Sequence, residues 1–124
     1  MRTAMVVNDN QFQRELLEVF LSTMGFAHIW TVSTPDDAKQ AYRDAVPTPS
    51  IVLIDHQLGM ADGLRLLREM FKEDESIRAV FLSIDAESER ECYKAGATEF
   101  VHKPFSIAEV GRAVNRAMRP GVVS

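Results

Sequence analysis

Short, almost uninterrupted apolar runs recur along this chain, and they constrain its fold more than any other feature. The runs Ala4-Met5-Val6-Val7 and Ile51-Val52-Leu53-Ile54 lack the alternation of apolar and polar residues that a half-exposed strand shows. Strands of this kind are buried on both faces, as happens when helices cover both sides of a parallel sheet. Amphipathic segments with helical spacing lie between the runs. The pattern therefore predicts an α/β protein.

Start and stop signals of helices divide the chain into five strand-then-helix units. Thr34 is typical of a residue that caps a helix, and Pro35 suits the first helical position. Ser106 and Glu109 form a capping-box pattern, and Gly25 suits the end of the first helix. We expect strands at residues 4–7, 28–31, 50–54, 79–82 and 99–101, followed in turn by helices at residues 10–24, 35–44, 63–72, 87–95 and 106–118.

The first predicted helix carries apolar residues at helical spacing. They are Phe12, Leu16, Leu17, Phe20 and Met24, and charged residues lie on the other side. A stripe of this kind normally packs against the core of a protein. We therefore expect these five side chains to form the buried face of the helix.

The size and composition of the chain are those of one ordinary globular domain. Its 124 residues, 46% hydrophobic and 26% charged, are enough to bury a core, so we expect a single domain over residues 1–124. No apolar stretch approaches the about 20 residues that cross a bilayer, and the first residues lack a signal-peptide pattern. We expect a cytoplasmic protein without membrane insertion. The net charge of −4 argues against direct nucleic-acid binding and favours a protein partner.

Polar residues stand at the ends of four predicted strands. Asp9 and Asp55 follow the first and third strands, and Ser83 and Lys103 follow the fourth and fifth. The carboxyl ends of parallel strands lie at one edge of a sheet, where open α/β proteins place their sites. We therefore expect these four side chains to converge. Two carboxylates and a lysine in one pocket indicate a site for a metal ion and a phosphoryl group.

Several short motifs occur along the chain at consistent intervals. They are Asn8-Asp9 with Arg14, Leu53-Ile54-Asp55 through Asp62-Gly63, Phe81-Leu82-Ser83, and the segment at 96–105, Gly-Ala-Thr-Glu-Phe-Val-His-Lys-Pro-Phe. Together they resemble the receiver domain of bacterial response regulators, the signalling partners of histidine kinases, over essentially the whole chain. The resemblance implies a doubly wound, flavodoxin-like (βα)5 sandwich of three layers with strand order 2-1-3-4-5.

The resemblance also implies a chemistry for the strand-end residues. Asp55 would take a phosphoryl group from a histidine kinase or a histidine phosphotransfer protein. A Mg²⁺ ion, or Mn²⁺, would be bound by Asp9, Asp55 and the backbone carbonyl of Gln57, with Asn8 in contact through water. Such a domain is a signalling switch and not an enzyme with a separate substrate, because it catalyses only its own phosphorylation and dephosphorylation.

The same resemblance assigns a switch and an output surface. Ser83 and Lys103 would hold the phosphoryl oxygens, with Lys103 paired to Asp55 before phosphorylation. Ser83 and Phe100 would move together when the domain switches, although Phe100 is almost as well explained as an ordinary core residue. The fourth helix, the fifth strand and the last helix would contact a downstream protein, and such surfaces also serve homodimers. Arginines at 112, 116 and 119 share one face of the last helix, as in a solvated stripe or a partner contact.

Four positions depart from the family pattern or leave it undetermined. Asn8 replaces one acid of the usual acidic pair, which should weaken Mg²⁺ binding. Ile84 stands where the family usually has a small residue, so it should narrow access to Asp55 and slow phosphotransfer. Gln57 and Asp85 occupy the positions that commonly tune the attack of water on the acyl phosphate, and they leave its lifetime open.

Other functions remain compatible with parts of this pattern. The main alternative is a receiver-like interaction module that is regulated without phosphorylation. A hydrolase or phosphatase with an aspartyl-phosphate intermediate is disfavoured, because it needs a second carboxylate where Gln57 stands. Flavin binding is disfavoured because no glycine-rich or hydroxyl-rich loop follows the first strand. The three histidines, His28, His56 and His102, are scattered, and we expect them to be structural or solvated.

Overall fold

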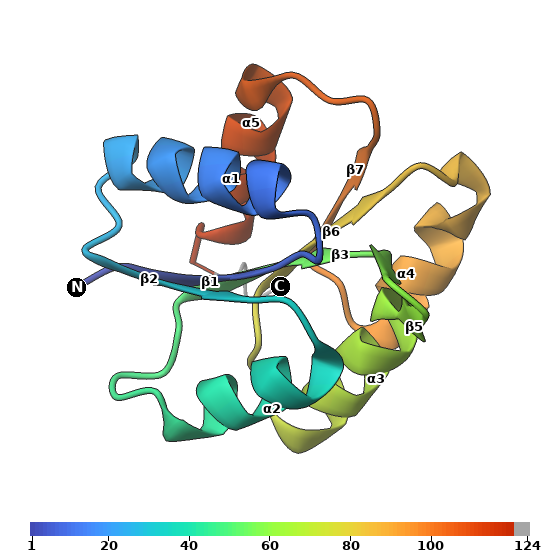
Figure 1. Cartoon of the computed structure of the whole chain (residues 1–124), viewed down its shortest axis with the longest axis horizontal. Coiled ribbons are helices and arrows are strands. Elements are labelled where there is room, and N and C mark those ends of the chain that lie inside the picture. Colours follow the sequence, from blue (N-terminus) through green and yellow to red (C-terminus); the bar gives the residue numbers. More distant parts are fainter. Residues whose placement is uncertain (121–124) are drawn as a thin grey trace.

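The central sheet contains five parallel strands in the order β2-β1-β3-β6-β7 (Figure 1). The computed structural model describes residues 1–120. Its sheet strands are β1 (Thr3–Val7), β2 (His28–Val32), β3 (Ile51–Asp55), β6 (Ala79–Ser83) and β7 (Glu99–His102). Counted along the chain, these five strands have the order 2-1-3-4-5. The predicted α/β, flavodoxin-like fold is therefore confirmed.

Helices cover both faces of the sheet and complete a three-layer sandwich (Figure 1). One face carries α1 (Gln11–Thr23) and α5 (Ile107–Ala117), and the other carries α2 (Pro35–Asp44), α3 (Gly63–Glu73) and α4 (Glu89–Ala95). Leu17 and Val114 belong to the core of the first face, and Leu67 and Cys92 to the core of the second. Within residues 1–120, no helix combines the length and the apolar character needed to cross a membrane.

Successive residues of the central strands enter opposite cores. In β1, Ala4 and Val6 pack on the side of α1 and α5, whereas Met5 and Val7 pack on the side of α2, α3 and α4. All four side chains are fully buried. Side chains alternate across a strand, so a strand covered on both faces must be apolar at every position. This explains the uninterrupted apolar runs of the sequence.

Helix caps form at the residues that the sequence indicates. The Thr34 hydroxyl accepts a hydrogen bond from Asp37 N at 3.2 Å, and Ser106 forms a full capping box with Glu109. The largest difference from a predicted boundary is at α4, because residues 86–88 form a separate 3₁₀ turn, η1 (Ala86–Ser88), before this helix begins. The Asp85 carboxylate accepts from Glu87 N at 3.0 Å and thereby caps this tighter turn.

A short hairpin that the sequence analysis did not predict lies between β3 and α3. In it, β4 (Gln57–Leu58) pairs with β5 (Ala61–Asp62), and Gly59 in the turn has a φ of +62°. Gly63 follows directly, at the start of α3. A Cβ atom at Gly63 would lie 2.0 Å from the backbone oxygen of Asp55. Only glycine therefore allows α3 to begin this close to the end of β3.

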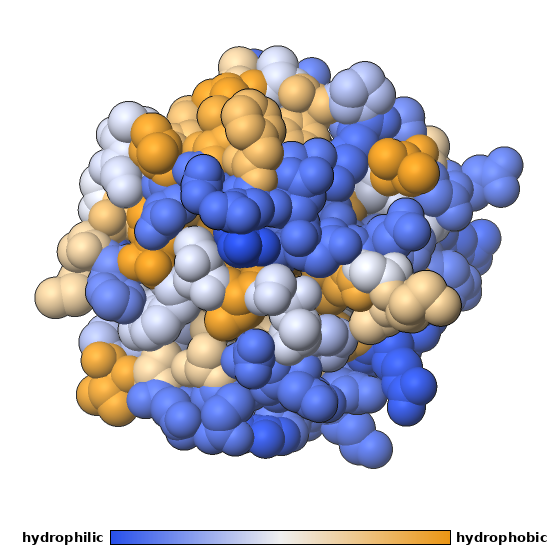
Figure 2. All heavy atoms as spheres, viewed as in Figure 1, coloured by the Kyte–Doolittle hydropathy of each residue, from blue (hydrophilic) through white to orange (hydrophobic). Residues whose placement is uncertain are grey.

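The buried face of α1 differs from the predicted one. Leu17 is fully buried as predicted, and Phe20 and Met24 pack against the core. Phe12 and Leu16, however, are 74% and 41% exposed, and Leu21, which was not predicted, is fully buried. Val19 is 64% exposed and continues the outer stripe. The apolar residues of α1 thus span more of the helix surface than the sheet can cover. Figure 2 shows apolar side chains at the surface in the upper part of the molecule, where Figure 1 places α1 and α5.

Candidate functional site

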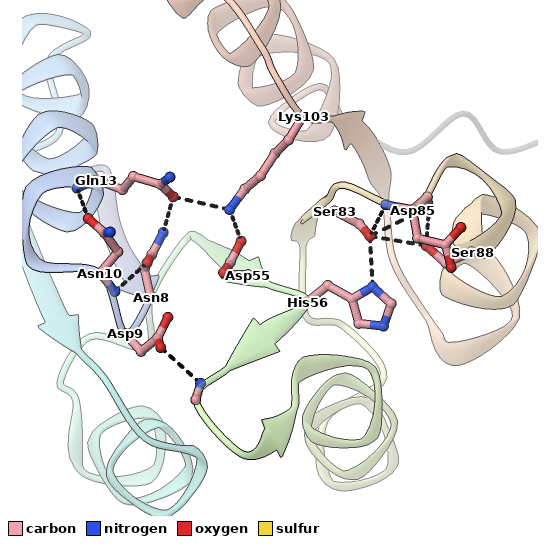
Figure 3. Close-up of polar contacts among 11 residues, drawn as sticks. Asn8, Asp9, Asn10, Gln13, Asp55, His56, Ser83, Asp85, Ser88 and Lys103 are labelled. Carbon is pink, nitrogen blue, oxygen red and sulfur yellow. Dashed lines mark hydrogen bonds and ion pairs between the residues drawn. The ribbon is translucent and has the colours of Figure 1, made fainter.

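An open pocket of about 610 Å³ lies at the carboxyl edge of β1, β3 and β6 (Figure 3). Its lining includes the four strand-end residues and three others singled out in the sequence: Asp9, Asp55, Ser83 and Lys103, together with Gln57, Ile84 and Asp85. Asn8 is buried next to Asp9, and Phe100 lies outside the lining. The parallel topology explains the convergence, because all five strands end at the same edge.

Asp55 is the most deeply placed carboxylate of the pocket. It is the last residue of β3 and is only 5% exposed. Burial raises the pKa of Asp55 above its ordinary value, and the nearby Asp9 raises it further, while Lys103 opposes both effects through a hydrogen bond and its charge. The charge of the ionised carboxylate is thus incompletely compensated by Lys103.

Lys103 holds its ammonium group against Asp55. The two side chains form an ion pair in which both are largely shielded from water. The backbone positions Lys103, because its N–H donates to the carbonyl of Ser83 at 2.8 Å, next to the end of β6. Lys103 Nζ also donates to Gln13 Oε1 at 3.1 Å. Lys103 therefore joins β7 to both β3 and α1.

Gln13 is a site residue that the sequence analysis missed. Its side-chain oxygen accepts from Lys103 Nζ and also from Asn8 Nδ2, at 3.1 Å in both cases (Figure 3). The Asn8 oxygen is engaged as well, since it accepts from Asn10 N at 2.8 Å. Gln13 lies in the first turn of α1, shortly after the strand-end acid Asp9, and this position could have indicated that its side chain reaches the pocket. Its contact with Lys103, 90 residues away, was not visible in the sequence.

Asp9 faces the hairpin that follows β3. Its carboxylate accepts from Gly59 N at 2.9 Å, which ties the end of β1 to the turn between β4 and β5. Gln57, in β4, lines the same side of the pocket. The oxygen atoms of Asp9, Asp55 and the Gln57 backbone are hard donors of the kind that Mg²⁺ prefers. Within residues 1–120, no group of three or more His, Cys, Asp or Glu side chains is arranged to bind a metal.

The Ser83 hydroxyl is buried and engaged on the side away from Asp55 (Figure 3). It accepts from Asp85 N at 3.0 Å, and it lies 2.7 Å from His56 Nδ1. His56, which we expected to be structural or solvated, thus contacts a pocket residue directly. Of the other two histidines, His28 packs edge-on to Trp30, and His102 lies 3.0 Å from the carbonyl of Ile84.

Two further residues border the pocket or its surroundings. Ile84 is 71% exposed and lines the pocket, so its side chain stands at the entrance. Phe100 is half-buried and stacks on Phe81 with 6.5 Å between the ring centroids. Phe81 in turn lies against the His56 ring at 5.1 Å. A continuous row of rings therefore connects the pocket to β7.

Comparison with known proteins gives a consistent result. The profile of the response regulator receiver domain matches residues 4–115. The chemotaxis protein CheY of Thermotoga maritima is 24% identical over 120 residues, which cover 95% of this chain and 98% of CheY. The transcriptional regulatory protein PhoP of Escherichia coli is 33% identical over 118 residues, which cover 93% of this chain and 51% of PhoP. The chain thus spans about half the length of PhoP.

Solved structures show the same fold. The receiver domain of NtrX from Brucella abortus superposes with a TM-score of 0.85 at 29% identity, covering 93% of this chain and 97% of that one. A chain of the CheX–CheY–BeF3–Mg²⁺ complex from Borrelia burgdorferi superposes with a TM-score of 0.89 at 24% identity, covering 96% of this chain and 90% of the matched one.

Proposed function

The chain belongs to the response regulator receiver family, and on this premise we propose that Asp55 is the phosphoacceptor of a two-component system. As a receiver it is a signalling domain and not a conventional enzyme. The observation that carries the proposal is the buried Asp55 carboxylate, which is paired with Lys103 and open to a pocket that also contains Asp9. We also propose that the domain acts in the cytoplasm.

The reaction forms an acyl phosphate on Asp55. A carboxylate oxygen attacks the phosphorus of a phosphohistidine, the P–N bond breaks, and its electron pair stays on the imidazole nitrogen. Lys103 is in place to move from the carboxylate to the phosphoryl oxygens. The Ser83 hydroxyl would donate to another phosphoryl oxygen after turning toward Asp55. The donor is the phosphohistidine of a histidine kinase or a histidine phosphotransfer protein.

A divalent cation fits this pocket. Asp9, Asp55 and the Gln57 carbonyl would bind Mg²⁺ or Mn²⁺, and Asn8 would contact it through water. The raised pKa of Asp55 supports this assignment, because the buried carboxylate has too little compensating charge from Lys103 alone. When bound, the ion would neutralise charge on the phosphoryl oxygens.

The output surface would be formed by α4, β7 and α5. A shallow groove of about 150 Å³ lies between β7 and α5, and Phe100, Arg112 and Arg116 line it. Phe100 stacks on Phe81, so a rearrangement in the pocket can reach this groove through the row of rings. A downstream protein or a second copy of this chain would bind here. The negative net charge of the chain favours a protein over nucleic acid as the partner.

A beryllofluoride titration followed by ¹H–¹⁵N NMR in Mg²⁺ tests the proposal, because beryllofluoride mimics an acyl phosphate. We expect shifts at Asp9, Ser83 and Lys103 that extend to Phe100 and α5 and that are absent in Asp55→Asn. Shifts that persist in Asp55→Asn would place the binding elsewhere. No response of the wild-type protein at saturating Mg²⁺ would overturn the proposal.

The second candidate function is an interaction module regulated without phosphate. Asn8, which is neutral, and Ile84, at the pocket entrance, are the observations that favour it. An unresponsive wild-type protein in the same titration would support this function. Partner binding to α4, β7 and α5 would then be independent of beryllofluoride.

A further inference from the structure

His56 stands directly after the proposed phosphoacceptor and faces the proposed switch hydroxyl (Figure 3). Its ring is held from three sides. Nδ1 lies 2.7 Å from Ser83 Oγ, Nε2 lies 3.5 Å from Asp62 Oδ1, and the ring packs on Phe81 at 5.1 Å between centroids. Asp62 is itself fixed as the N-cap of α3, since it accepts from Leu64 N at 2.9 Å. The imidazole is therefore positioned by three side chains, two from β6 and one from β5.

The hydrogen-bonding capacity of Ser83 decides which of the two side chains, Ser83 or His56, donates the hydrogen bond between them. A serine hydroxyl has one hydrogen to donate and two lone pairs to accept with. Asp85 N already donates to one lone pair, at 3.0 Å. The Asp62 carboxylate next to Nε2 favours the His56 tautomer that carries its hydrogen there, which leaves Nδ1 as an acceptor. The other acceptor near the Ser83 hydroxyl is the carbonyl of Asp85, at 3.5 Å, whereas His56 Nδ1 lies at 2.7 Å. The single hydrogen of Ser83 is then directed to His56, the nearer acceptor.

We propose that His56 is a positioning residue that holds the Ser83 hydroxyl in the unphosphorylated arrangement, with its hydrogen turned away from Asp55. The proposal rests on the proposed function, in which Ser83 must donate that same hydrogen to a phosphoryl oxygen. The two hydrogen bonds exclude each other, because Ser83 has only one hydrogen. Switching therefore requires the bond between Ser83 and His56 to break, and His56 biases the domain toward its resting state.

Substitution of His56 tests the proposal through the affinity for beryllofluoride in Mg²⁺. His56→Phe keeps a ring against Phe81 and removes the acceptor, so we expect beryllofluoride to bind about fivefold more tightly, the factor typical of one lost neutral hydrogen bond. His56→Asn places an acceptor near the position of Nδ1 and should restore the wild-type affinity. His28→Phe, on β2 and away from the pocket, is the matched control and should not change it.

A double-mutant cycle separates positioning from a general effect on structure. In the Ser83→Ala background no hydroxyl remains to be held, so His56→Phe should have no further effect on the affinity. Ring-nitrogen NMR gives a second readout, in which we expect the hydrogen of resting His56 on Nε2 and a change of the Nδ1 resonance when beryllofluoride binds. A hydrogen on Nδ1 in the resting protein would overturn the proposal.

The outcomes distinguish this proposal from the proposed function. The role of His56 alone would be overturned if the wild-type protein bound beryllofluoride as tightly as a folded His56→Phe variant, or more tightly. The role of His56 would also be overturned if His56→Phe changed the affinity for beryllofluoride equally in the wild-type and Ser83→Ala backgrounds. A wild-type protein that does not bind beryllofluoride would overturn the proposed function and, with it, the role of His56.

Discussion

At the scale of single residues, the neutral Asn8 leaves the pocket with one negative charge fewer than an acid at this position would give it. It is buried, and its amide donates to Gln13, whose oxygen also accepts from Lys103. Asn8→Asp adds a second carboxylate beside Asp9 and turns the Gln13 amide so that Lys103 loses this partner. We expect Mg²⁺ to bind about tenfold more tightly, or about 1.4 kcal/mol, a modest value for two charges near a protein surface. An NMR titration with Mg²⁺ measures this, with Gln11→Glu as a control that adds charge outside the pocket. Unchanged or weaker binding in Asn8→Asp would contradict the prediction.

At the scale of elements, a hydrogen bond joins α2 to the end of α3. Tyr42 donates to the Asp74 carboxylate at 2.7 Å, and hydrogen bonds from Ser76 and Tyr42 hold the pKa of Asp74 below its ordinary value. A carboxylate with a lowered pKa stabilises the fold above its ordinary pKa, and this contribution is lost as the pH falls through the lowered value. We expect Tyr42→Phe to cost about 1 kcal/mol of unfolding free energy at pH 7 and clearly less at pH 3. Urea denaturation at both pH values measures this cost. The control is Tyr93→Phe, on the surface of α4, which should change the unfolding free energy by less than about 0.5 kcal/mol. An equal cost for Tyr42→Phe at both pH values would argue against a role of the ionised Asp74.

At the scale of the whole molecule, the exposed stripe of α1 lies next to the pocket of the proposed phosphoacceptor. Phe12, Leu16 and Val19 form it, and Asn10, the cap of the same helix, lines the pocket. We expect this stripe to contact the histidine-bearing donor protein. Replacing all three residues with Gln should slow transfer from a phosphohistidine protein at least about tenfold, as expected when apolar contacts worth about 1.4 kcal/mol are lost. Phosphorylation by acetyl phosphate should not change, and Val46→Gln, in the loop before β3, should affect neither rate. Equal slowing with both donors would show that the stripe acts on the pocket and not on docking.

Local signals explain how much of this protein was predictable from its sequence. The five strand-then-helix units follow from hydrophobic periodicity, and the starts of α2 and α5 follow from Thr34 and Ser106, which cap their helices through contacts three residues away. The closeness of Asp9, Asp55, Ser83 and Lys103 follows from the parallel order of the strands, which places all of their carboxyl ends at one edge. Each of these inferences needs only neighbouring residues or the general topology of an α/β sheet.

Tertiary structure alone decided how individual side chains are oriented within that frame. The hairpin of β4 and β5, the outward position of Phe12, the bridge from Gln13 to Lys103 and the contact of His56 with Ser83 were all missed in the sequence. Each depends on the rotation of one element against another, or on a contact between residues far apart in the chain. The sequence by itself therefore determined the class of fold and the chemical groups of the pocket. The packing of helices on the sheet determined which of those groups face one another, because hydrogen bonds and ion pairs require distances and directions that periodicity does not specify.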